Sequence, residues 1–118
     1  MRVVSLLLCL VWCAAAQASD FRLTKDATVV WYDGDIRFGG LSGVELSDDG
    51  QRLLAIGDRG IWVTADLERE DGRRERVRTT GIGPRLGVDG KPLGEREAGA
   101  EGLAVDAEGR AYVSFEGF

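Results

Sequence analysis

Histidine is absent from this chain of 118 residues, and cysteine and proline occur only twice each. Without histidine, the chain alone cannot build a Ser-His-Asp triad, a Cys-His pair or a His-ligated zinc or iron site. Both cysteines, Cys9 and Cys13, lie in an apolar segment at the N-terminus. Removal of that segment would leave neither a thiol nor a disulfide. These absences exclude several common catalytic and metal-binding classes.

Positive charge is also scarce, with 15 Lys and Arg against 20 Asp and Glu and a formal net charge of −5. Because contacts to nucleic-acid phosphates need Lys and Arg, we expect no nucleic-acid partner. We interpret the one basic cluster as a solvated strand edge or loop. Its members are Arg73, Arg74, Arg76 and Arg78.

The first 18 residues are typical of a secretory signal peptide. Arg2 supplies a positive start, the range 3–12 is apolar, and Ala16-Gln17-Ala18 fits an A-x-A cleavage site. We therefore predict cleavage between Ala18 and Ser19, a periplasmic or secreted mature chain, and no membrane contact after cleavage. The apolar segment is shorter than the roughly 20 residues of a spanning helix. A lipoprotein signal acylated at Cys13 is the other alternative, but Trp12 is bulky where a small residue is needed.

No window after the signal has the apolar periodicity of a helix, and 17 glycines interrupt short runs rich in Val, Thr and aromatic residues. The stretch 40–56 is echoed without a gap by the stretch 99–115, with glycines and apolar residues at matching positions. Each copy is typical of a β-hairpin with an acidic-glycine turn. A hairpin that repeats in this way predicts a β-propeller or another repeat array.

The remaining segments extend this all-β prediction. We expect further strands at 27–32, 61–65 and 74–80, the last two paired, so that one block holds four antiparallel strands like a propeller blade. The glycine- and proline-rich range 81–99 predicts a long loop. Trp31 and Trp62 are expected to pack on the sheet rather than to bind carbohydrate. We interpret four acidic residues as turn formers, because no complete EF-hand loop is present: Asp33, Asp35, Asp48 and Asp49.

Four motifs in this order resemble the start of the family called esterase-like activity of phytase. They are Phe38–Gly43, Ala55–Gly60, Asp89–Leu93, and Ala100–Ala104 followed by Tyr112–Glu116. The resemblance implies a secreted or periplasmic β-propeller that hydrolyses phosphoesters. It also implies that residues 19–118 are the N-terminal portion of a truncated propeller domain, one four-stranded antiparallel blade and part of a second. Gly99 departs from the family pattern, which has an acidic residue at that position.

The resemblance directs attention to four candidate site residues. Glu101, at the entry to a strand, and Glu116, at the position of Gly57 in the repeat, are candidate ligands of Ca²⁺, which takes about 6–8 oxygen ligands. Asp58 and Arg59 are candidate catalytic residues, because Arg59 could grip a phosphate and Asp58 could hold a cation or orient that arginine.

Each candidate also has a structural interpretation. Glu101 could cap a turn or pair with an arginine, Glu116 could be a solvated strand end, and Asp58 with Arg59 could form a hairpin turn with a local salt bridge.

Two functions therefore remain open. The first is a metal-dependent phosphoesterase that acts on a small-molecule phosphoester and is inactive as this isolated chain. The second is a non-catalytic propeller module that binds a ligand or a protein. Since one and a half blades leave sheet edges open, self-association through those edges is also expected.

Overall fold

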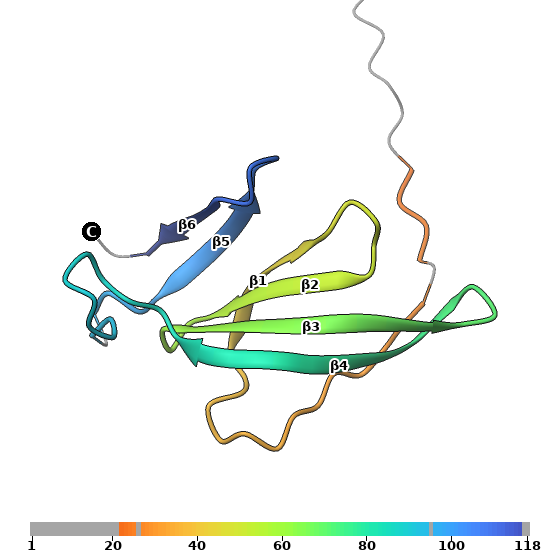
Figure 1. The fold of residues 1–118 in the computed structure, drawn as a ribbon, viewed down its shortest axis with the longest axis horizontal. Coiled ribbons are helices and arrows are strands. Elements are labelled where there is room, and N and C mark those ends of the chain that lie inside the picture. Colours follow the sequence, from red (N-terminus) through yellow and green to blue (C-terminus); the bar gives the residue numbers. More distant parts are fainter. Residues whose placement is uncertain (1–21, 26, 95, 117–118) are drawn as a thin grey trace, which may run out of the picture.

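The computed structural model describes residues 22–25, 27–94 and 96–116, and the predicted signal peptide lies outside them. The described chain is all-β, as predicted, and its strands form two antiparallel sheets (Figure 1). One sheet has four strands in the order β1-β2-β3-β4, and the other is the hairpin β5-β6. No described segment forms a helix with the length and apolar character that crossing a bilayer demands. The strand bounds are β1 Leu41–Leu46, β2 Arg52–Gly57, β3 Ile61–Glu70, β4 Arg73–Pro84, β5 Ala100–Val105 and β6 Ala111–Phe115.

The β3–β4 hairpin is longer than predicted. We expected a strand at 74–80 opposite 61–65, but 61–65 pair with the range 79–84, and Asp66–Glu70 pair with the range 73–78. Asp71 and Gly72 both have positive φ, 49° and 77°, as a tight hairpin turn requires. Arg78 bridges Asp66 at 2.5 Å and Glu68 at 2.9 Å across the strands. Cross-strand ion pairs thus let a charged stretch continue the ladder where sequence composition indicated a loop.

The predicted loop at 81–99 begins later, because Gly81 to Pro84 belong to β4. Trp62 explains this extension. It pairs with Gly83, and a Cβ on Gly83 would lie 2.6 Å from the indole. The two glycines at 81 and 83 therefore leave room for the ring over the sheet. The loop from 85 onward has its own structure, with a bridge between Leu86 and Pro92 and a hydrogen bond from Leu93 N to Arg85 O at 3.0 Å.

The strand predicted at 27–32 is wrong, since the described residues there form no strand. Trp31 nevertheless packs on the core, meets Phe38 edge to face at 5.2 Å, and donates from Nε1 to Thr79 Oγ1 at 3.0 Å. Its packing role was therefore predicted correctly even though its backbone conformation was not. The β-branched run formed no strand because its aromatic side chain, and not a backbone ladder, ties it to β4.

Both predicted hairpins are present, but the prediction that they align without a gap is wrong. Their second strands match only when one residue is skipped. Ser47 N donates to Arg52 O at 2.9 Å to close the first turn, and Asp106 N donates to Arg110 O at 3.0 Å to close the second. The second turn is therefore one residue shorter and lacks a counterpart of Gln51. The slip was hidden in the sequence because β2 is apolar at consecutive positions, so β6 matches it in either register.

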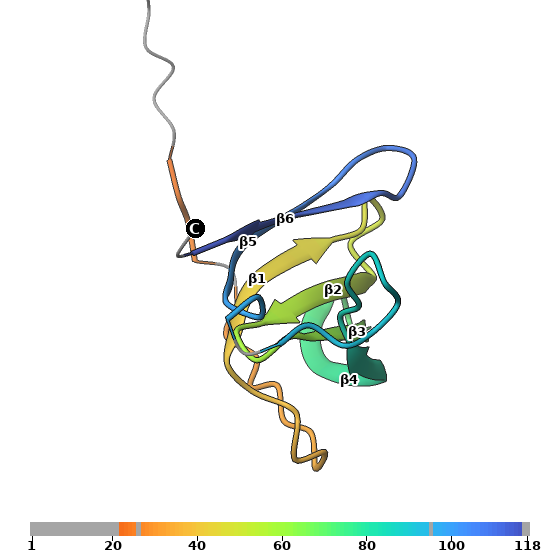
Figure 2. The same ribbon diagram turned by 90° about the vertical axis from the view of Figure 1, so that its left-hand side faces the viewer.

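The β5–β6 hairpin lies beside β1 of the first sheet (Figure 2). Gly43 permits this approach, because a Cβ there would lie 3.0 Å from Leu103 Cβ and 3.2 Å from Leu103 N. Ser42 Oγ also donates to Ala100 O at 2.5 Å. Two hairpins stacked through their first strands are the arrangement expected of neighbouring propeller blades.

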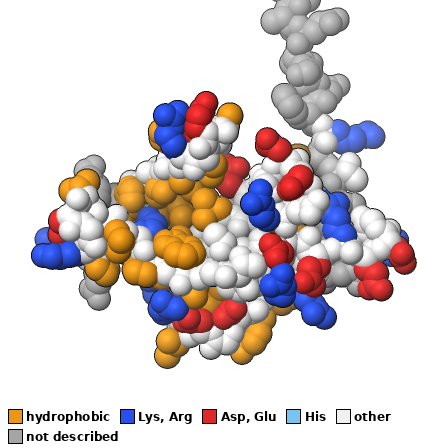
Figure 3. Space-filling model, in the orientation of Figure 1, with side chains coloured by type: hydrophobic (Ala, Val, Ile, Leu, Met, Phe, Trp, Pro, Cys, Tyr) orange, Lys and Arg blue, Asp and Glu red, His pale blue; other side chains and the backbone are white. Residues whose placement is uncertain are grey.

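The hydrophobic core is small and belongs to the first sheet. Ala55, Ile61 and Val63 form it, with Val63 fully buried, and Trp31 and Phe38 pack against it. Hydrophobic side chains also gather on the surface between the β5–β6 hairpin and the sheet, while charged side chains surround the β3–β4 tip (Figure 3). The fold thus has one packed side and apolar surface that no described residue covers.

Candidate functional site

The four candidate residues lie at one end of the two hairpins, which we call the rim and define as Asp58, Arg59, Glu101 and Glu116. This end is where β1 and β5 begin and β2 and β6 finish. The Ser42–Ala100 hydrogen bond joins the two hairpins there. The topology therefore places residues that are far apart in the sequence at the same end of the two hairpins.

Asp58 and Arg59 form the β2–β3 turn, which Gly60 N closes by donating to Gly57 O at 3.3 Å. Arg59 Nε lies 3.9 Å from Asp58 Oδ1, and both side chains are more than half exposed. The two residues therefore form a hairpin turn with a local ion pair, which was the structural interpretation given for them in the sequence. At 3.9 Å the contact is too long for a hydrogen bond, so the guanidinium keeps donors for another anion.

Glycines make room for both of these side chains. Gly40 has φ of 59°, and a Cβ there would lie 2.1 Å from Asp58 Oδ1. A Cβ on Gly39 would lie 3.6 Å from an Arg59 Nη2 atom. The Asp58 backbone is fixed as well, because its N–H donates to Gly40 O at 2.8 Å. The glycine pair before β1 therefore positions the turn.

Glu116 is the counterpart of Asp58 and not of Gly57, which corrects the predicted alignment. Glu116 N donates to Gly99 O at 3.1 Å, as Asp58 N donates to Gly40 O. The correction follows from the shorter second turn. Each hairpin thus ends its second strand on a carboxylate at the rim.

Glu101 occupies the bulge at the start of β5, as Ser42 does at the start of β1. Ser42 points across to the neighbouring hairpin, where its Oγ donates to Ala100 O. Glu101 is exposed, and no described hydrogen bond or ion pair engages its carboxylate. Glu101 is thus the counterpart of Ser42, whose side chain contacts the first strand of the neighbouring hairpin.

The rim has the donor chemistry for calcium but does not complete a site. Carboxylate oxygens are the ligands Ca²⁺ prefers. Among the described residues, no three Asp, Glu, His or Cys side chains lie close enough together to hold a metal ion. Further ligands would have to come from groups outside the described residues.

Arg85 lies behind the rim and was not predicted from the sequence. It is 9% exposed, and its Nη2 donates to Gly57 O at 3.0 Å and to Ala98 O. Its guanidinium carbon lies 5.2 Å from the centre of the Phe115 ring. Nε and Nη1 are buried without a hydrogen-bond partner among the described residues, and burial lowers the pKa of the guanidinium. Arg85 thus connects β2, the loop before β5 and β6. The only sequence signal was an arginine in the otherwise uncharged stretch 79–88.

The opposite end of the hairpins has an open groove between the two turns, and its lining is partly acidic. Leu54 and Val105 contribute apolar surface, whereas Glu45, Asp66 and Asp106 contribute carboxylates. Arg52 also lines the groove, so both signs of charge are present. The groove lies at the other end of the hairpins from the rim and is separate from it.

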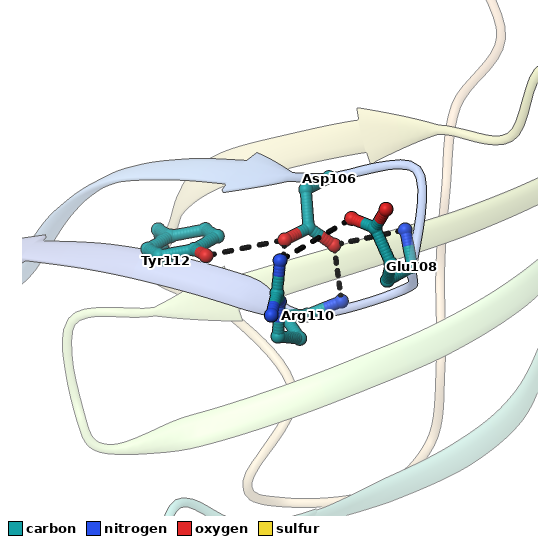
Figure 4. A network of polar contacts seen from close by, with 4 residues as sticks. All are labelled: Asp106, Glu108, Arg110 and Tyr112. Atoms are coloured by element: carbon teal, nitrogen blue, oxygen red, sulfur yellow. Dashed lines mark hydrogen bonds and ion pairs between the residues drawn. The ribbon is translucent and has the colours of Figure 1, made fainter.

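Asp49 holds the first turn, as predicted, and Asp106 has the same role in the second. Asp49 accepts from Ser47 Oγ at 2.6 Å and from Gln51 N at 3.0 Å. In the second turn Asp106 accepts from Arg110 Nε at 2.6 Å and from Tyr112 OH at 3.1 Å (Figure 4). The Arg110 hydrogen bond is the main cause that lowers the pKa of Asp106. These carboxylates stabilise the turns through hydrogen bonds within the chain.

The comparisons with known proteins agree with the repeat and its motifs. The family Phytase-like, described as esterase-like activity of phytase, matches residues 36–118. No curated protein and no solved structure matches the chain. The match spans most of the chain and includes both hairpins and all four rim residues. The resemblance found in the motifs is therefore confirmed, and the chain belongs to the Phytase-like family.

Proposed function

We propose that this chain contributes a phosphate-binding rim to a secreted, phytase-like phosphoester hydrolase. The observation that carries the proposal is the exposed Arg59 beside Asp58, at the end of the hairpins where Glu101 and Glu116 also lie, in a family described by esterase-like activity. Arg59 would donate to two phosphate oxygens at once and neutralise charge that accumulates on them. Asp58 would orient the guanidinium from its fixed backbone position.

Calcium is the proposed cofactor of the complete site. Asp58, Glu116 and Glu101 would supply carboxylate ligands from this chain, and bound calcium would add positive charge beside the phosphate. Because the described residues do not complete the ligand set, we expect the isolated chain to bind phosphate without hydrolysing esters.

The test is phosphate binding to the purified chain, measured by calorimetry or NMR titration with inorganic phosphate. We expect Arg59→Ala to weaken binding at least about tenfold, since a charge-assisted hydrogen bond contributes about 1.5–3 kcal/mol. Arg76→Ala is the matched control, because Arg76 lies on β4, away from the rim, and its described ion pair is a 4.0 Å contact with Glu68. Equal binding by the wild type and Arg59→Ala would contradict the role of Arg59.

Turnover is tested separately on a complete propeller that includes this chain. We expect calcium-dependent release of p-nitrophenol from its phosphate ester. A complete propeller that binds phosphate but releases no p-nitrophenol, with or without calcium, would support the non-catalytic binding module instead.

A further inference from the structure

Arg85 holds both ends of the turn that carries the two candidate catalytic residues. Its backbone N–H donates to Gly60 O at 2.7 Å, and its side-chain Nη2 donates to Gly57 O at 3.0 Å. Asp58 and Arg59 are the two residues between these carbonyls. A single buried residue, 9% exposed, therefore fixes the backbone on both sides of the turn.

The side chain of Arg85 also reaches the second hairpin. Its Nη2 donates to the carbonyl of Ala98, which comes shortly before β5. Ala98 packs close to the turn, since a Cβ on Gly60 would lie 3.2 Å from the Ala98 Cβ. The guanidinium carbon lies 5.2 Å from the centre of the Phe115 ring, and Phe115 directly precedes Glu116. The same guanidinium thus contacts segments that lead to rim residues in both hairpins.

We propose that Arg85 is a positioning residue for phosphate binding at the rim, an inference that rests on the proposed function. Because one nitrogen joins Gly57 to Ala98, Arg85 fixes the turn of the first hairpin relative to the segment before Glu101. Arg59 then meets phosphate from a defined backbone position, so less conformational freedom is lost on binding. Arg85 itself does not contact the phosphate, because its Nε and Nη1 atoms are buried.

Arg85→Met is the variant that tests this role. Methionine keeps a long unbranched side chain but cannot donate a hydrogen bond. Gly57 O also accepts from Gly60 N at 3.3 Å. Ala98 O also accepts from Ala100 N at 2.8 Å. Each carbonyl therefore loses one donor and keeps another, and we expect the variant to fold.

The first experiment measures amide hydrogen exchange by NMR without phosphate. The Asp58 and Glu116 amides report on the rim, because each makes a backbone hydrogen bond there. The Ser47 and Asp106 amides are the matched controls, since they close the turns at the opposite end of the same two hairpins. We expect Arg85→Met to speed exchange at both rim amides about tenfold and to leave the controls unchanged. Equal acceleration at all four amides would mean that Arg85 contributes only to overall stability.

The second experiment repeats the NMR titration with inorganic phosphate. We expect Arg85→Met to bind phosphate at least about fivefold more weakly than the wild type, although Arg85 does not touch the ligand. Val63→Ala is the control for lost stability, because Val63 lies in the core of the first sheet, and it should leave the phosphate affinity unchanged. Weaker binding without faster exchange at Asp58 would mean that Arg85 acts through its charge alone, which would overturn the positioning role.

Phe115→Leu gives a second variant that leaves the hydrogen-bond donors of Arg85 in place. It removes the aromatic ring beside the guanidinium. We expect exchange at Asp58, which lies in the other hairpin, to become about two- to fivefold faster. Unchanged exchange at Asp58 in this variant would show that the guanidinium does not couple the two hairpins.

The outcomes separate this inference from the proposed function. A wild type that binds no phosphate would contradict the proposed function, while faster exchange at the rim of Arg85→Met would still support the positioning role. Phosphate affinity that stays the same in Arg85→Met would overturn the inference and leave the proposed function in place.

Discussion

The β1–β2 hairpin and the β5–β6 hairpin have the same bulge at the start and a similar acidic-glycine turn, but within the described residues only the first belongs to a four-stranded sheet. The difference appears in their cores. Ala55 on β2 is fully buried under the neighbouring strands, whereas its counterpart on β6, Val113, is only half-buried. Similar local sequence therefore forms a hairpin in both places, but burial depends on the strands that follow.

The largest expected effect is on stability, when a core side chain of the four-stranded sheet is truncated. The matched substitution is made in the β5–β6 hairpin. Val63→Ala should lower the free energy of unfolding by about 2 kcal/mol, because it leaves a cavity in a packed site. Val113→Ala should cost less than about 0.5 kcal/mol, as half-exposed substitutions usually do. Urea denaturation followed by tryptophan fluorescence measures both. Equal losses would show that the hairpins are equally packed.

A smaller effect separates the two equivalent glycines. Gly43→Ala should cost about 1–2 kcal/mol, because its methyl group would press on Leu103 and Ile56 between the hairpins. Gly102→Ala is the matched control, since its methyl would meet mainly the Ser114 hydroxyl, which can rotate away. Denaturation midpoints of the two variants give the comparison. A Gly102→Ala cost as large as that of Gly43→Ala would contradict the close approach of β5 to β1.

Arg85 and Phe115 connect the two hairpins more weakly. A double-mutant cycle with Arg85→Met and Phe115→Leu should give a coupling energy of about 0.5–1 kcal/mol, as expected for a guanidinium over an aromatic ring. The cycle removes the separate cost of unpairing the Gly57 and Ala98 carbonyls. Additive single-mutant effects would mean that the stacking contributes nothing.

The smallest expected effect is a difference in how salt changes the pKa values of Asp106 and Asp49, one in each hairpin turn. Since the pKa of Asp106 is lowered in the folded state, its stabilisation is present above the ordinary carboxyl pKa and is lost as the pH falls through the lower folded value. The pKa of Asp49 is lowered mainly by the neutral Ser47 hydroxyl. Added salt should therefore raise the pKa of Asp106 more than that of Asp49, because it screens the Arg110 ion pair. Carboxyl NMR titrations at low and high salt test this, and equal shifts would contradict it.

The sequence alone was sufficient for the hairpins, because glycine turns and alternating side chains are local signals. It was insufficient for register and strand length. The missing counterpart of Gln51 could not be seen in an apolar strand, and the extension of β3 and β4 depends on ion pairs such as Arg78–Asp66 across the strands. Within the candidate site, the four rim residues were predicted from the motifs that resemble the family. Arg85 could not be predicted, because its burial depends on Phe115, which comes from a distant strand.

The adjacency of the two hairpins is tested most directly by one NMR measurement, the cross-relaxation between Gly43 Hα and the Leu103 amide proton. The backbone nitrogen of Leu103 lies 3.2 Å from where a Cβ on Gly43 would be. We therefore predict a strong cross-peak between these protons. The absence of that cross-peak, with Gly43 Hα showing contacts only to β2, would mean that β5 does not lie against β1 and that the hairpins are not neighbouring blades.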